Sequence, residues 1–124
     1  HALEVRNAAA VNATLVQAAR AHNVALVIED SDEAPLHGDL SADFVYARIK
    51  RSQPRLRAGL PAPLQQRWAA RAQAWAQGAA VEDLPLITSP ADPTPREVYL
   101  LCIGAGKRRN PAAAIALQQR CDTR

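Results

Sequence analysis

A short segment near the carboxyl end of the chain constrains the fold most strongly. It is an unbroken apolar run, Val98–Ile103, followed by the turn Gly104-Ala105-Gly106 and then by three consecutive cations. After the cations, Asn110-Pro111 opens an alanine-rich pattern of helical character. A continuous apolar run of this kind is typical of a strand that is buried on both faces of a parallel sheet. The segment therefore predicts a strand, a glycine turn and a helix that begins at the Asn-Pro pair, in an α/β fold.

Three further strands are predicted upstream: Ala2–Arg6, Val24–Asp30 and Asp43–Ile49. Between the first two, apolar residues recur at helical spacing as far as His22, and Asn23 suits the left-handed residue that ends many helices. Strands that alternate with helices in this way imply a parallel sheet whose strands are joined by crossover helices.

A second helix is predicted from Pro63 to Gln77. Its apolar stripe contains Leu64, Trp68, Ala72 and Trp75. The two Trp rings could stack on nucleic-acid bases, but their helical spacing favours packing in the core. Arg67 and Arg71 are assigned to the other side of this helix. Prolines between Ala79 and Pro95 predict a long loop, and the connection 31–41 is too short to predict a helix.

The predicted elements leave part of the sheet uncovered. Three helices can cover one face of a four-stranded sheet, and they leave its other face bare. A strand that starts almost at the first residue also leaves one edge of the sheet open. The chain starts at His1 and contains no Met, which indicates a processed chain or a part of a longer one. We therefore expect residues 1–124 to be a single fragment of a larger domain, or to associate with a copy of itself.

Five blocks of sequence carry a family resemblance. They are ALEVRNAA, VALVIED, ADFVYARI, RWAARAQAWAQG and REVYLLCIGAGKRRNPAAAIAL. In order and spacing they resemble the carboxyl-terminal half of the YecE-like family, domain of unknown function seventy-two. The resemblance implies a (β/α)8-type (TIM) barrel, of which this chain holds the later strands and lacks the amino-terminal half. Because no activity is established for that family, the resemblance implies a fold and a candidate site but no reaction.

The resemblance implies a site at the carboxyl ends of the strands, where (β/α)8 barrels carry their functional residues. Four residues match polar positions of the family pattern and are candidate catalytic residues: Glu4, Arg6, Asp30 and Arg48. Two carboxylates and two guanidiniums could surround a ligand, since Arg binds phosphate or carboxylate through paired hydrogen bonds. The alternative is an ion-pair network that fills the barrel interior without chemistry. Asn7 and Ile103-Gly104-Ala105 depart from the family pattern, where relatives carry a His and an aromatic-Asp-Asn element.

The glycine turn is the candidate anion site, and its anion-binding residues would be Gly104, Gly106, Lys107, Arg108 and Arg109. Backbone N–H groups at a glycine turn before a helix can cradle phosphate, and barrels often bind phosphate at their last loops. The string is not a Walker A motif, so a tight turn with solvated cations is the alternative. A second basic cluster comprises Arg48, Lys50, Arg51, Arg55 and Arg57, and the two clusters could form one positive rim.

Two functions from different classes stay open at this point. The first is the binding of a phosphate-bearing ligand or nucleic acid by the basic rim. The second is a barrel enzyme of undefined reaction, such as metal-assisted phosphoester hydrolysis by Glu4 and Asp30. The net charge of +3 gives little support to nucleic acid, because thirteen of the fifteen cations are Arg, which GC-rich codon usage produces by itself.

The sequence assigns no cofactor and predicts no metal site. His37 lies near several acidic residues, but we expect this acidic loop to be polar surface. No apolar run approaches ~18 residues, so no membrane span is predicted. The two cysteines lack metal-ligand spacing and no signal peptide is visible, which favours a cytoplasmic location.

Overall fold

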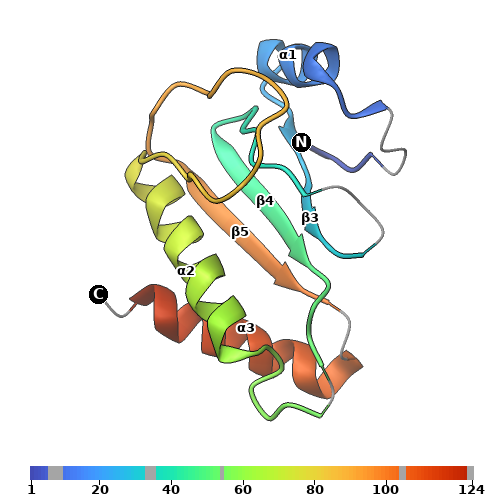
Figure 1. The fold of residues 1–124 in the computed structure, drawn as a ribbon, viewed down its shortest axis with the longest axis vertical. Helices are drawn as coiled ribbons and strands as arrows, with labels where there is room; N and C mark the ends of the chain where they lie inside the picture. The colour runs from blue at the N-terminus through green and yellow to red at the C-terminus, as the bar shows by residue number, and fades with distance from the viewer. Residues whose placement is uncertain (6–9, 33–35, 54, 104–105, 123–124) are drawn as a thin grey trace.

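The computed structural model describes residues 1–5, 10–32, 36–53, 55–103 and 106–122, and of 106–110, 112, 113 and 122 it describes the backbone (Figure 1). Its strands are β1 (Ala2–Leu3), β2 (Ala25–Leu26), β3 (Ile28–Asp30), β4 (Phe44–Ile49) and β5 (Glu97–Cys102). Its helices are α1 (Ala13–Ala21), α2 (Ala62–Gln77) and α3 (Gly106–Asp122). Every strand pairing is parallel, as the alternation of strands and helices predicted.

The run predicted as one strand over Val24–Asp30 forms two short strands, because it changes its partner at Val27. Strand β2 pairs with β1, whereas β3 pairs with β4, which in turn pairs with β5. The amide of Val27 still bonds to the carbonyl of Leu3, at 2.9 Å. The spatial order is therefore β1, then the β2–β3 run, then β4 and β5, which is also the order along the chain.

Local chemistry fixes both ends of α1, and its carboxyl end lies where the sequence predicted it. The side chain of Asn12 accepts a hydrogen bond from the amide of Leu15 at 3.0 Å, which caps the amino end of the helix. At the other end, Asn23 adopts a φ of 52°, the left-handed conformation that Asn tolerates better than most residues.

Helix α2 begins after Pro61 and ends at Gly78, whose φ of 78° favours glycine. Trp68 and Trp75 are buried, which confirms their prediction as packing residues. The assignment of Arg71 to the outer side of the helix is wrong. Its guanidinium lies 4.6 Å from the ring centre of Trp68 and bonds to Asp83, so stacking and ion pairing allow its burial.

Helix α3 begins at Gly106, four residues before the predicted start at Asn110-Pro111. Pro111 therefore lies inside the helix. A proline at this position keeps φ near the helical value, but it supplies no N–H to the carbonyl four residues before it, and its ring crowds that carbonyl. Consequently the three cations belong to the first turn of α3 and not to a loop before it. Among the described residues, no helix has the length and apolarity that crossing a membrane requires.

The helices cover one face of the sheet and leave the other bare. Along β4, alternate side chains are buried and half-buried, because successive side chains point to opposite faces. The buried set packs with α2 and α3 into one core that includes Ile28, Val45, Ala47, Ile49, Trp68, Trp75 and Leu117. Helix α1 lies apart from these helices, at the other end of the molecule, and packs on Leu26 (Figure 1). The predicted bare face is confirmed for the described strands.

The segment 79–95 has no regular secondary structure, as predicted, but it is anchored to the core. Leu84 is buried, and both carboxylate oxygens of Asp39 accept backbone amides, those of Ile87 at 2.8 Å and Thr88 at 3.1 Å. Asp39 is only 1% exposed, and His37 beside it is also buried. The prediction that this acidic loop is polar surface is therefore wrong for Asp39 and His37, because the carboxylate of Asp39 accepts backbone amides of the 79–95 segment. It is right for Asp32, whose side chain is 90% exposed.

Candidate functional site

A polar cluster lies on the bare face of the sheet, at the carboxyl ends of the strands. Arg48, near the end of β4, donates from Nη1 to Oε2 of Glu4, just beyond β1, at 2.6 Å. This bond passes over the β2–β3 run, which lies between β1 and β4. Both side chains keep access to solvent, with 24% of Arg48 and 32% of Glu4 exposed. The structure therefore brings together two of the four candidate catalytic residues, Glu4 and Arg48.

Glu29 extends this cluster, although the sequence reasoning missed it. It is the residue of β3 in register with Arg48, so both side chains project from the bare face. Lys50 approaches Glu29 to 3.1 Å, and the hydroxyl of Ser31 donates to it at 2.8 Å. Burial raises the pKa of Glu29, but these bonds and the nearby Arg48 outweigh burial and hold the pKa below its ordinary value. Glu29 is therefore a carboxylate at neutral pH.

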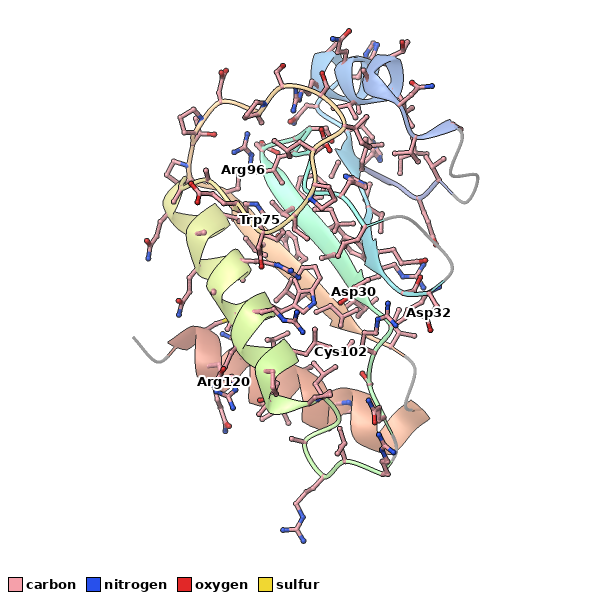
Figure 2. The ribbon with its side chains drawn as sticks, viewed as in Figure 1. Asp30, Asp32, Trp75, Arg96, Cys102 and Arg120 are labelled. Carbon is pink, nitrogen blue, oxygen red and sulfur yellow. The ribbon has the colours of Figure 1, made fainter. Side chains whose placement is uncertain are left out.

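Asp30 does not belong to this cluster. It is in register with Ile49, which is buried in the helix-covered core, so its side chain points to the opposite face from Arg48. There it accepts hydrogen bonds from the indole N–H of Trp68 at 3.0 Å and from Nε of Arg51 at 3.1 Å. Figure 2 shows Asp30 between the end of its strand and α2, with Asp32 nearby. Asp30 thus holds α2 on the sheet and cannot act with Glu4 on one substrate.

The second basic cluster is largely paired with carboxylates. Lys50 bonds to Glu29, and Arg51 bonds to Asp30 and, at 2.6 Å, to Asp32. Arg55, in the loop after β4, is exposed and bonds to a glutamine. Cations and anions therefore alternate along this edge of the sheet, and its described part is not a uniformly positive rim.

Several sequence predictions fall outside the described residues. These are the candidate catalytic residue Arg6, the departure from the family pattern at Asn7, the turn residues Gly104 and Ala105, and the side chains of the anion-site candidates Lys107, Arg108 and Arg109. The backbone still places the amino end of α3, at Gly106, three residues after Ile103. The amide of Ile103 bonds to the carbonyl of Ile49 at 2.8 Å, so the chain lies beside the end of β4 three residues before α3 begins.

The guanidinium of Arg48 has unused donors. Its Nε is buried and has no hydrogen-bond acceptor in the part of the chain that the structure describes. A guanidinium carries five N–H donors in a planar fork, and Glu4 engages it through Nη1. A buried donor without an acceptor costs about 1–3 kcal/mol, so an acceptor that reached Nε would be favoured. Arg48 therefore holds one buried donor that is unsatisfied among the described residues, beside its ion pair with Glu4.

The described residues contain no metal-binding cluster, and one of the two cysteines is buried. Among them, no three His, Cys, Asp or Glu side chains lie where they could hold a metal ion. The thiol of Cys102, at the end of β5, faces the core, where burial raises its pKa to about 11. A thiol with this pKa is almost fully protonated at neutral pH and is a poor nucleophile.

The fold and the cluster define a parallel α/β protein with charged residues at the carboxyl ends of its strands. A family model matches residues 1–123, that of the proteins of unknown function DUF72. The chain belongs to this family, in agreement with the YecE-like resemblance of its sequence. Comparison with the curated proteins and with the solved structures found no significant match.

Proposed function

We propose that the chain forms the later half of a (β/α)8-type barrel whose interior is lined by the bare face. Three observations support this architecture. All pairings are parallel, the strands follow one another in space in chain order, and the helices pack on one face. In such barrels the face without helices is the interior, and ligands bind at the carboxyl ends of the strands.

We further propose that this barrel binds a small phosphate-bearing ligand through Arg48. The observation that carries this proposal is the guanidinium itself, oriented by Glu4 at 2.6 Å and left with a buried Nε donor that has no acceptor among the described residues. Phosphate offers adjacent oxygens that match neighbouring donors of a guanidinium. The amino end of α3 adds support, since it begins at the same edge and carries a positive partial charge.

A small ligand suits this edge better than nucleic acid does. Nucleic-acid affinity depends on several cations that are available to successive phosphates. Here Lys50 and Arg51 are already bonded to carboxylates, and Glu4 and Glu29 add negative charge. Metal-assisted phosphoester hydrolysis by Glu4 and Asp30 is disfavoured, because these carboxylates lie on opposite faces of the sheet.

Isothermal titration calorimetry with inorganic pyrophosphate tests the proposal. Losing a charge-assisted contact costs about 1.5–3 kcal/mol, so Arg48→Gln should weaken binding about tenfold to hundredfold. Arg67→Gln, a change of equal charge on the exposed side of α2, should leave binding unchanged. The same titration with a single-stranded oligonucleotide at low salt separates the two ligand classes. If neither pyrophosphate nor the oligonucleotide bound, or if both variants lost affinity equally, the proposal would be wrong.

A further inference from the structure

A cavity lies at the amino ends of β4 and β5, at the end of the strands opposite to Arg48. It has a volume of about 420 Å³ and is bounded by the carboxyl end of α2, by Gly38 and Leu40, and by the 79–95 loop. All of these segments lie between β3 and β5 in the chain, so the cavity depends neither on the bare face nor on the edge of β1. Small-molecule sites in proteins have volumes of about 300–1,000 Å³, and this cavity falls within that range.

Most of the cavity wall is apolar, and its larger side chains are those of Leu40, Trp75, Leu84 and Leu86. Trp75 and Leu84 are buried, whereas Leu86 is 44% exposed, so the cavity is open to solvent beside Leu86. In Figure 2 the 79–95 loop encircles Trp75 and Arg96, both of which line the cavity. Ligand sites are typically apolar with a few polar groups that fix the orientation of the ligand, and Arg96 is such a group here.

Backbone carbonyls hold the guanidinium of Arg96 in place. Its Nε donates to the carbonyl of Ala42 at 2.9 Å, and its Nη1 donates to those of Asp92 and Thr94, each at 3.1 Å. Among the described residues, Nη2 has no acceptor and no carboxylate forms an ion pair with Arg96. Burial lowers the pKa of Arg96, and the neighbouring Arg20 lowers it further. Arg96 is therefore a fixed cation without a bonded counter-ion in the described part of the chain.

We propose that this cavity binds a small monocarboxylic acid with an apolar body. The carboxylate would accept hydrogen bonds from Nη2 of Arg96, and the hydrocarbon part would contact Trp75 and Leu86. A single negative charge suits the cavity better than a dianion does, because Asp92 also lines it and the carboxyl end of α2 carries a negative partial charge. The site and its ligand class differ from those proposed for Arg48, so the two proposals can fail separately.

Titration of the 124-residue chain with hexanoate, followed by ¹H–¹⁵N spectra of the indole groups, tests the inference. The indole resonance of Trp75 can be assigned by its disappearance in Trp75→Phe, and hexanoate should shift it in a saturable manner, because Trp75 lines the cavity. Hexanol has the same chain length but no charge, and it should bind about tenfold to hundredfold more weakly. The absence of a saturable shift, or equal affinity for hexanoate and hexanol, would overturn the inference.

Two sets of variants locate the carboxylate. Arg96→Gln should remove the preference for hexanoate over hexanol. Because Arg96 also fixes the 79–95 loop through backbone carbonyls, a second pair of variants uses Leu86, whose exposure lets the chain tolerate a polar side chain. Leu86→Glu puts a negative charge beside the cavity and should weaken hexanoate binding about fivefold or more relative to Leu86→Gln, the uncharged control of the same size. Equal hexanoate affinity of the two Leu86 variants, or a preference that persisted in Arg96→Gln, would overturn the inference.

Discussion

Replacing Asp30 by Ala should lower the free energy of unfolding without affecting the proposed ligand site at Arg48. Asp30 is buried and accepts hydrogen bonds from Trp68 and Arg51. Because Trp68 is fully buried, its indole N–H would lose its acceptor without gaining water, at a cost of about 1–3 kcal/mol. The half-buried pair with Arg51 adds up to about 1 kcal/mol. We expect Asp30→Ala to lower the free energy of unfolding by about 3 kcal/mol in total, which lowers Tm by roughly 10 °C for a domain of this size.

The assay is urea unfolding followed by Trp fluorescence, at one fixed protein concentration. Asp30→Asn keeps an oxygen acceptor for Trp68 and should cost about 1 kcal/mol or less. Glu4→Ala removes a more exposed ion pair and should change the free energy of unfolding by about 1 kcal/mol at most. Pyrophosphate affinity should be unchanged in Asp30→Asn, which stays folded. The reasoning would be refuted if Asp30→Ala were as stable as Glu4→Ala, or if Asp30→Asn lost pyrophosphate binding.

Three further perturbations test other parts of the structure. A Cβ at Gly38 would lie 2.8 Å from Cβ of Leu84, so Gly38→Ala should cost about 1–3 kcal/mol by overpacking, measured by urea unfolding; a neutral effect would contradict this contact. Burial lowers the pKa of His37 despite the opposing charge of Asp39, so the unfolded chain binds the proton more tightly. The contribution of His37 to the free energy of unfolding should therefore be fully present above pH 6.5 and decrease as the pH falls below it. This pH dependence should disappear in His37→Gln, as urea-unfolding midpoints measured across this pH range would show. The thiol of Cys102, with a pKa of about 11, should react with a disulfide reagent at pH 8 only after unfolding, and rapid reaction of the folded chain at Cys102, located by mass spectrometry, would refute its burial.

The elements with a clear period were predictable from the sequence. Helix α2 and strand β4 lie within one residue of their predicted bounds, because their apolar residues recur with a definite period. Strand β5 does so as well, because its apolar run has the length of a strand. The burial on both faces that this run predicted is wrong, since Tyr99 and Leu101 are exposed on one face. The cap at Asn23 followed from the left-handed conformation that Asn tolerates. The start of α3 was misplaced, because a proline that usually opens a helix lies inside this one.

The faces of the β2–β3 run were less predictable. VALVIED is apolar at most positions, so its sequence does not reveal which residues face the helices, and a shift of one residue exchanges Glu29 for Asp30. The register with β4 resolves this ambiguity, because the alternation of buried and half-buried side chains along β4 shows which face each of its residues occupies. The burial of Arg71 and Asp39 depended on partners distant in the sequence, which a local pattern cannot supply.

The Nε–H of Arg48 offers the most direct test of the proposed anion site. Its resonance in a ¹H–¹⁵N spectrum of the arginine side chains can be assigned by its disappearance in Arg48→Lys. Addition of inorganic pyrophosphate should shift this resonance in a saturable manner, because a new acceptor engages a donor that has none among the described residues. The resonance of Arg67 should stay in place. An Arg48 resonance that did not move, or that moved no more than that of Arg67, would contradict the central claim that Arg48 binds the ligand.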